Sequence, residues 1–184
     1  MVQSAIALRQ ALTEDKSAIY RWLYHSDHIL DHLLEKGQKV PSLEEFYNED
    51  FPDYFFTALF PEKGNCFVIT KDDNAIGAIS YSAFHLWPKI AELDIWLSSS
   101  QETGRGYGVS ALIILIEKLK QQGFSRLFIR PAKHNIYAQK AYQKAGFRVN
   151  VTPELSRYYL PETIDRYGVG DFGANHDVFM EMIL

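Results

Sequence analysis

The feature that most constrains the fold is a glycine-spaced loop between a strand and a helix. Ile90 to Leu97 has the composition of a strand, and Val109 to Gln122 is a strongly apolar helical run. Between them, Thr103 to Gly108 places glycine at every second position. Glycine permits left-handed backbone and close approach to a ligand, while a helix start offers unpaired N–H groups and a favourable dipole. This turn is therefore predicted to bind an anion such as a phosphate.

Spacing excludes two familiar phosphate-binding motifs. The Walker A loop needs Lys and then Ser or Thr after its last glycine, whereas Val109 and Ser110 follow Gly108. The dinucleotide fingerprint needs G-x-G-x-x-G after a first parallel strand, and here the glycines alternate after several antiparallel-looking strands. Taken alone, the glycines are equally compatible with a flexible connection that binds nothing.

Length and composition predict one cytoplasmic domain. The 184 residues, 47% of them apolar, suit a single globular domain spanning 1–184. A formal net charge of −4 gives no basic field for nucleic acid. No apolar run approaches the ~20 residues of a membrane span, and the first residues do not resemble a signal peptide. Cys66 is the only cysteine, so no internal disulfide can form. We expect a monomer or homodimer.

The order of strand and helix patterns predicts an α/β (α+β) domain, a mixed sheet with helices on its faces. Strand patterns cover residues 5–9, 65–71, 75–87, 90–97, 124–130, 147–151 and 177–183, and helical patterns cover 14–24, 109–122 and 134–145. Asp72, Asp73 and Asn74 have turn chemistry, which predicts a hairpin. Ser42 to Glu45 has the pattern of a capping box and predicts a further helix.

Two motifs in order resemble those of the GNAT superfamily of N-acetyltransferases. Its central acetyl-CoA pattern is Gln or Arg, x, x, Gly, x, Gly or Ala; Thr103, Gly106 and Gly108 occupy the marked places, with Thr103 replacing the usual first residue. A second register runs from Gln101 through Gly104 and Gly106. The stretch Asn135 to Phe147, with Ala138, Tyr142 and Gly146 in step, is similar to the later motif of that superfamily.

The likeness runs from about Ala75 to Val151 and implies a GNAT-like, mostly antiparallel sheet of six to seven strands, with acetyl-CoA as the cofactor. It implies that the Trp96 N–H lies near the thioester oxygen where the strand bulges, and that Leu97 and Ser98 pair with the pantetheine arm. The remaining cofactor contacts that it implies are Thr103, Gly104, Arg105, Gly106, Tyr107, Gly108, Val109, Asn135 and Tyr142.

Three residues are candidates for the catalysis. On a strand, Glu92 and Asp94 project to one face, so either carboxylate can serve as the base that deprotonates an amine. The alternative is that both only satisfy basic neighbours or water. The resemblance implies that Tyr142 is the general acid for the coenzyme A thiolate, against the alternative of a packed aromatic ring.

The acceptor is predicted to be a primary amine of a small molecule, contacted by Asp94, Tyr81 and Asp27. The start of the chain is similar to aminoglycoside 6'-N-acetyltransferases, although Arg130 stands where that branch carries an aspartate and is expected to repel a polycation. A protein N-terminal or lysine acetyltransferase, or a non-catalytic acyl-CoA-binding module, is the alternative function.

Two further clusters have a plain structural explanation. Acidic residues interleave with aromatic ones between Glu44 and Phe55, and a solvated face over an aromatic core is favoured over an acidic wall for an amine. His25, His28 and His32 have partly helical spacing, but no Cys or further His accompanies them, so no metal is expected.

Overall fold

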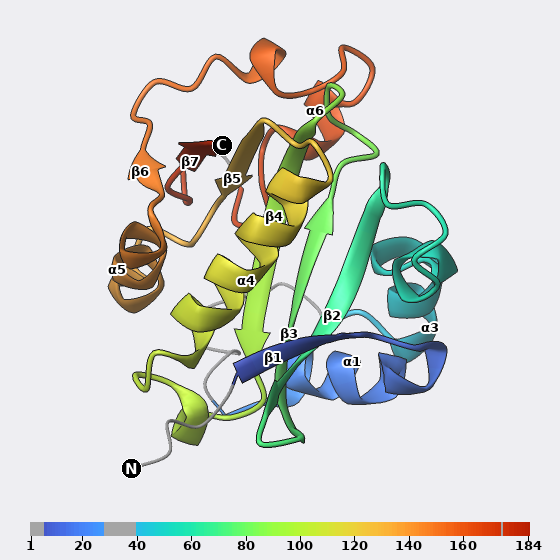
Figure 1. Ribbon diagram of the computed structural model, residues 1–184. Helices are drawn as coiled ribbons and strands as arrows, with labels where there is room; N and C mark the ends of the chain where they lie inside the picture. The colour runs from blue at the N-terminus through green and yellow to red at the C-terminus, as the bar shows by residue number, and fades with distance from the viewer. Residues whose placement is uncertain (1–5, 28–39, 174) are drawn as a thin grey trace.

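The computed structural model describes residues 6–27, 40–173 and 175–184 (Figure 1). Seven strands of this described part form one sheet in the order β1-β2-β3-β4-β5-β7-β6. Neighbouring strands are antiparallel except β4 and β5, which are parallel. The predicted mixed, mostly antiparallel sheet flanked by helices is therefore confirmed.

The strands are β1 (Ile6–Gln10), β2 (Gly64–Lys71), β3 (Asn74–Ser82), β4 (Ile90–Leu97), β5 (Arg126–Ile129), β6 (Arg148–Val149) and β7 (Met180–Ile183). The helices are α1 (Lys16–His25), α3 (Leu43–Glu45), α4 (Tyr107–Gln121), α5 (Ile136–Ala145) and α6 (Ile164–Tyr167). Shorter turns cover Thr13–Asp15, Phe46–Asp50, Asp53–Phe56, Ser100–Glu102 and Leu155–Arg157.

Two predicted boundaries are wrong for local reasons. The strand expected to reach Trp87 ends at Ser82, because the next two N–H groups, of Ala83 and Phe84, both turn to the Lys63 carbonyl. The helix expected from Val109 begins at Tyr107, because Gly106 takes a left-handed conformation (φ 84°) as its N-cap. Both differences arise from turns that the apolar pattern does not record.

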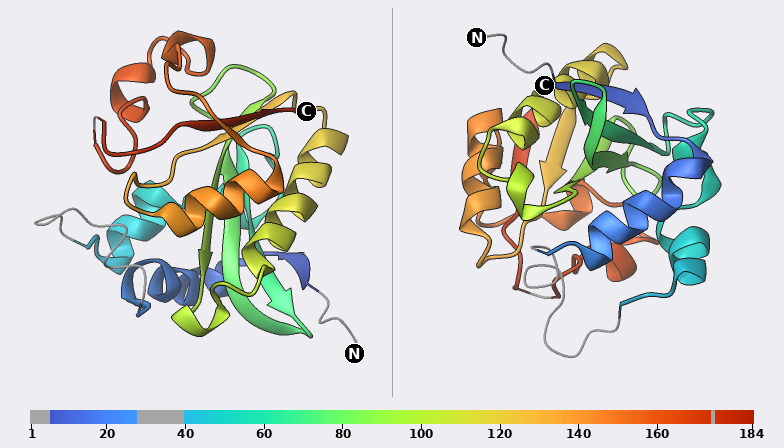
Figure 2. Two further views of the ribbon diagram at one scale, coloured as in Figure 1. Left: turned by 90° about the vertical axis from the view of Figure 1, so that its left-hand side faces the viewer. Right: turned by 90° about the horizontal axis from the view of Figure 1, so that it is seen from below.

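One face of the sheet is covered by α4 and α5, which lie side by side in Figures 1 and 2. The apolar stripe of α4 has the spacing of a helix packed against a sheet. Its buried members are Ala111, Leu112, Leu115, Ile116 and Leu119. They join the largest core cluster, which also contains Leu93 of β4 and Tyr142 of α5.

The opposite face is covered by α1 and the aromatic segment that follows α3. Phe46, Phe55 and Trp96 are buried in a second core cluster on this face. Glu44 and Glu45 are exposed, so the prediction of a solvated face over an aromatic core is confirmed for them. The predicted capping box also forms, since the Glu45 carboxylate accepts from the Ser42 N–H at 2.6 Å.

The C-terminal segment packs over one end of the sheet and forms a third core cluster. Phe128 of β5 stacks on Phe179 with ring centroids 4.9 Å apart, and Tyr158 and Tyr159 pack beside them. The segment contains two short helical turns, Leu155–Arg157 and α6. It therefore reaches back to β4 and β5, although it is distant from them in sequence (Figure 2).

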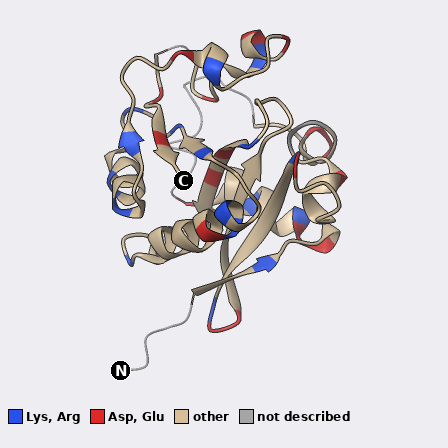
Figure 3. Cartoon of the chain, turned by 45° about the horizontal axis from the view of Figure 1, so that its top comes forward, with Lys and Arg blue, Asp and Glu red and all other residues tan. Residues whose placement is uncertain are grey.

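Charged residues of both signs are interspersed over the described elements, as Figure 3 shows, in keeping with the small net charge of −4. Within the described part of the chain, every helix is too short or too polar to cross a lipid bilayer.

Candidate active site

The sheet opens between β4 and β5. Their parallel ladder covers only Ile90–Glu92 and Arg126–Phe128. The rest of β4, Leu93–Leu97, pairs with β3 alone among the strands of the described residues. The C-terminal half of β4 therefore presents a free backbone edge that an extended ligand can pair with.

The register of the β3–β4 ladder determines which backbone N–H groups of β4 face this opening. The register is regular from Gly77–Leu97 to Ser82–Glu92, and the Ser98 N–H continues it by donating to Ile76 O at 2.8 Å. In an antiparallel ladder alternate residues point their N–H groups to the same side. The Trp96 N–H therefore points toward β3, as the Ser98 N–H does, and the Leu97 N–H points into the opening.

The predicted bulge near Trp96 is therefore wrong, because one unbroken register holds Glu92–Leu97 against β3. The Trp96 N–H lies in the ladder and does not face the opening. Of the predicted edge residues, Leu97 has its N–H and C=O free for a ligand, whereas the Ser98 N–H is occupied. Ile95 joins Leu97 on the open edge by the same alternation.

The glycine loop has the geometry of an anion site. Gly104 and Gly106 adopt φ of 71° and 84°, which only glycine takes without strain, and open space lies where their side chains would be. The first backbone bond of α4 runs from Ser110 N to Gly106 O, and no side chain of the described residues caps this end. The N–H groups of Tyr107 to Val109 are thus available to a diphosphate, which fits the site.

The other loop residues differ in what they offer. Thr103 donates its hydroxyl to Ser100 O at 2.7 Å and closes the preceding turn, and Arg105 is exposed. Lys71, at the end of β2, places its ammonium 5.2 Å from the Tyr107 ring and adds a positive charge beside the loop. Sequence reasoning missed Lys71, because only the folded sheet brings the end of β2 to this helix.

Asp27 supports the loop, whereas it was expected to contact the acceptor. Its two carboxylate oxygens accept from the Ser100 N–H at 2.8 Å and from the Ser100 hydroxyl at 2.5 Å. These bonds tie the end of α1 to the turn before the glycines. The prediction of Asp27 as a substrate contact is corrected, because both oxygens already have partners in the protein.

Asp94 and Tyr142 lie on opposite faces of the sheet, close enough for the charge of Asp94 to act on Tyr142. By strand alternation Asp94 shares the face of Trp96, whereas Tyr142 belongs to the α4–α5 core. Burial raises the pKa of Tyr142 above its ordinary value, and the charge of Asp94 raises it further. The hydroxyl therefore stays protonated at neutral pH and can donate to a ligand atom in the opening.

The pKa of Asp94 is raised well above the ordinary value of 3.8, first by loss of hydration and then by the charges of Asp171 and Glu92. Its side chain nevertheless remains open to solvent. The neighbouring carboxylates are therefore the firmer cause of the shift. A carboxylate with a raised pKa is a stronger base, and this one has room beside it for an acceptor.

Glu92 is held in a buried ion pair. Its Oε1 lies 2.6 Å from Arg130 Nη2, and its Oε2 lies 3.2 Å from His85 Nε2. Burial alone would raise the pKa of Glu92, but the charge of Arg130 and the hydrogen bond with His85 outweigh burial and lower it. A weakly basic carboxylate with both oxygens engaged is poorly suited to remove a proton. This geometry fits the alternative from the sequence that Glu92 only satisfies basic neighbours.

Two other predicted residues have structural partners. Tyr81 is fully buried in the α4–α5 core and donates its hydroxyl to Pro61 O at 2.8 Å, so its prediction as an acceptor contact is wrong. The Asn135 side chain caps α5 by accepting from the Ala138 N–H at 3.0 Å. The predicted repulsion by Arg130 is also wrong, because its side chain is 7% exposed and neutralised by Glu92.

Of the three histidines, His25 is exposed at the end of α1, and His28 and His32 lie outside the described residues. No group of three or more potential metal ligands occurs within residues 6–27, 40–173 and 175–184.

The order of a β4 edge, a glycine turn and an α5 tyrosine agrees with a family-level match. A model of the "Acetyltransferase (GNAT) domain" family matches residues 6–148. The chain belongs to the GNAT acetyltransferases. A GNAT acetyltransferase uses acetyl-CoA as its acetyl donor, so this protein is an N-acetyltransferase with a coenzyme A site.

Solved structures share the fold of this GNAT protein at low sequence identity. Aminoglycoside acetyltransferase AAC(6')-Ib with ribostamycin and coenzyme A is 18% identical, with a TM-score of 0.70 over 97% of this chain and 93% of that one. RimL, the ribosomal L7/L12 alpha-N-protein acetyltransferase with coenzyme A, is 19% identical, with a TM-score of 0.69 over 100% and 97%. The PaiA N-acetyltransferase of Thermoplasma acidophilum is 17% identical, with a TM-score of 0.63 over 98% and 99%.

Proposed function

We propose that this GNAT protein transfers the acetyl group of acetyl-CoA to a primary amine of a small molecule. Acetyl-CoA supplies an activated acetyl group as a thioester, which the amine attacks directly. The proposal rests on the free edge of β4, with Asp94 and Tyr142 on opposite faces of the sheet and close enough for the charge of Asp94 to act on the Tyr142 hydroxyl. A proton acceptor and a proton donor on either side of a bound thioester suit this transfer.

Each residue has one task in the proposal. Asp94 takes the proton of the ammonium group, directly or through water, because a free amine is the nucleophile. The Leu97 N–H, on the free edge of β4, is available to stabilise the negative charge that would develop on the thioester oxygen. Tyr142 Oη donates to the departing sulfur. The N–H groups that begin α4 hold the diphosphate.

A small acceptor is favoured over a protein by what lies on the sheet face that carries Asp94. The aromatic segment from Phe46 to Phe56 packs over the sheet face that carries Asp94, and Phe51 lies 5.7 Å from the Trp96 ring. The charge of Asp171 acts on the same carboxylate. An acidic residue beside an aromatic segment suits a compact cationic amine better than an extended peptide.

Substituting Tyr142→Phe tests the proposal. The change should lower turnover at least tenfold with little effect on coenzyme A affinity, because it removes the donor and keeps the packed ring. Tyr137→Phe is the matched control, since that tyrosine lies on the same helix and is 87% exposed. Thiol release and calorimetry with coenzyme A measure the two quantities. Equal turnover in Tyr142→Phe and the wild type would remove Tyr142 from the reaction.

The acceptor class needs a separate screen. Thiol release from acetyl-CoA should be measured with polyamines, aminoglycosides, amino acids and short peptides, and thermal shift with coenzyme A confirms that each sample binds the cofactor. Release with small amines and none with peptides is expected. Release with peptides alone would favour a protein acetyltransferase, and binding without release from any amine would favour a non-catalytic module.

A further inference from the structure

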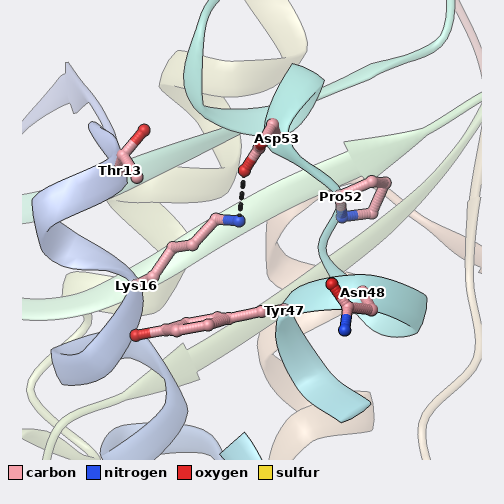
Figure 4. A pocket seen from close by; sticks show the side chains of 6 residues that line it. All are labelled: Thr13, Lys16, Tyr47, Asn48, Pro52 and Asp53. Atoms are coloured by element: carbon pink, nitrogen blue, oxygen red, sulfur yellow. Dashed lines mark hydrogen bonds and ion pairs between the residues drawn. The ribbon is translucent and has the colours of Figure 1, made fainter. Parts of the chain in front are cut away.

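A pocket lies between the start of α1 and the segment that follows α3, as Figure 4 shows. Its volume is about 460 Å³, which is within the range of small-molecule sites. None of the described residues that line it belongs to β4 or to the glycine turn, so the proposed acetyl transfer uses none of them. The lining residues are Thr13, Lys16, Tyr47, Asn48, Pro52 and Asp53.

Lys16 places a buried charge at this pocket. Its side chain is 4% exposed, and its ammonium lies 5.0 Å from the centroids of both the Tyr47 ring and the Phe56 ring. Among the described residues, the one ionic partner of Lys16 is Asp53, whose Oδ1 lies 2.7 Å from Nζ. An ammonium has three N–H donors, so this bond leaves donors for a ligand oxygen. Because burying a charge costs free energy, packing alone does not explain a lysine at this position.

Asp53 adds the opposite charge on the solvent side of the pocket. Its side chain is 83% exposed, whereas that of Lys16 is almost fully buried. A carboxylate can accept about four hydrogen bonds, so Asp53 can hold Lys16 and still accept from a ligand. A simple anion would be repelled by Asp53, and a simple cation would be repelled by Lys16. A ligand that carries both charges on neighbouring groups avoids both repulsions and adds a second ion pair, antiparallel to the first.

The rest of the wall comes from an uncommon backbone turn. Residues Phe46–Asp50 form a single π-helical turn that brings Tyr47 and Asn48 to the pocket. Such turns are rare in proteins and often occur at functional sites. The Tyr47 ring and Pro52 offer apolar surface, and the exposed Asn48 amide offers a donor and an acceptor. A ligand with an apolar group next to its charges therefore suits this pocket.

We propose that this pocket binds an α-amino acid with an apolar side chain. The carboxylate of the amino acid accepts from the Lys16 ammonium, and its own ammonium group donates to Asp53. The apolar side chain lies against the Tyr47 ring and Pro52. This binding site is distinct from the site of acetyl transfer and does not rest on the proposed function.

Three ligands with the same phenyl group separate the two charges. L-Phenylalanine carries both, 3-phenylpropionate carries only the carboxylate, and phenethylamine carries only the ammonium group. Calorimetry with the full chain, in the absence of acetyl-CoA, measures each affinity. L-Phenylalanine should bind at least about tenfold more tightly than either of the others, because each of those lacks one hydrogen bond between charged groups.

Lys16→Met tests the carboxylate contact, because methionine keeps most of the apolar stem and removes the buried charge. The affinity for L-phenylalanine should fall at least about tenfold. Lys63→Met is the matched control. The Lys63 ammonium also lies near an aromatic ring, 5.1 Å from that of Phe60, but Lys63 is exposed and does not line the pocket. This variant should keep the wild-type affinity, and thermal unfolding confirms that both variants are folded.

Asp53→Asn provides a test that does not depend on how Lys16→Met folds, because Asp53 is exposed. In this variant the affinities for L-phenylalanine and 3-phenylpropionate should approach each other. The change removes the partner of the ammonium group and the repulsion of a lone carboxylate at the same time. Asp94→Asn should leave the affinity for L-phenylalanine unchanged, because Asp94 does not line the pocket.

The proposal is overturned if L-phenylalanine does not bind to the wild type, if folded Lys16→Met binds it with wild-type affinity, or if Asp53→Asn keeps the wild-type preference. A loss of affinity in Asp94→Asn also overturns it, because the amino acid would then occupy the acceptor site. None of these outcomes removes the acetyl transfer. Absence of thiol release from every amine would instead overturn the proposed function and leave the amino acid site unaffected.

Discussion

Replacing Gly106 with alanine should weaken coenzyme A binding much more than it weakens folding. Gly106 is the N-cap of α4, with a φ of 84°, and open space lies where a Cβ would be placed. Alanine therefore meets no steric clash with a neighbour, and its cost is the strain of a left-handed backbone, about 1–2 kcal/mol. The chain can relieve that strain only by rotating the peptide groups that begin α4.

Such a rotation turns the N–H groups of Tyr107 to Val109 away from the position of the diphosphate. A hydrogen bond to a charged group contributes about 1.5–3 kcal/mol. The loss of one such bond weakens binding by roughly 10- to 150-fold, since each 1.4 kcal/mol is about a factor of ten. We therefore expect an increase of at least about tenfold in the Kd for coenzyme A.

Gly123→Ala is the matched control. Gly123 also has a φ of 84° and open space at its Cβ position, but it follows the other end of α4. Both variants should lose similar stability, with the Tm falling by about 2–4 °C for each kcal/mol. Calorimetry with coenzyme A and thermal unfolding would be measured on both. Binding of wild-type strength by Gly106→Ala, or an equal loss of affinity in Gly123→Ala, would refute the assignment of the diphosphate to this turn.

Three further predictions concern the carboxylates of β4 and their neighbour Asp171. Glu92→Gln should destabilise the protein by about 3–5 kcal/mol at pH 7, because it leaves Arg130 buried without its partner. Because the pKa of Glu92 is lowered on folding, its contribution to the free energy of unfolding is fully present above pH 4.5 and is lost as the pH falls through its folded-state pKa. Urea unfolding should therefore show that the difference in stability between Glu92→Gln and the wild type shrinks in acid. A difference that does not change with pH would contradict this assignment. If Asp94 is the base, kcat/KM should fall on acidification at a pH well above 3.8 and Asp94→Asn should remove that limb. Asp171→Asn removes a neighbouring negative charge and should move the limb to lower pH; a shift to higher pH would contradict the coupling.

Local sequence signals predicted the elements whose causes are local. The strand predicted for Ile90 to Leu97 has those bounds in the structure. The capping box at Ser42 forms as predicted, because its two bonds join residues three positions apart. The glycine turn was found for the same reason, since φ values of 71° and 84° are properties of single residues. In each case the deciding interaction lies within a few residues of the chain.

Contacts between residues that are far apart in the sequence could not be predicted in the same way. Alternation placed Glu92 and Asp94 on one face, but it could not reveal that Arg130 would pair with Glu92 and not with Asp94. Tyr81 was wrongly expected at the acceptor site. It lies across from Leu93, on the α4–α5 side, and only the β3–β4 register fixes that position. The partner of Asp27 lies 73 positions away at Ser100, beyond the reach of any local pattern.

The short β4–β5 ladder explains why these residues can act together. A sheet paired along the whole of β4 would separate its two faces and would leave no free edge for the pantetheine arm. Because pairing ends at Glu92, the next residues of β4 keep a free edge, and Asp94 and Tyr142 influence each other through the gap. The residue at which pairing ends also bears the carboxylate that Arg130 holds. The last paired residue of β4 thus contributes an anchor, and the first unpaired residues contribute the chemistry.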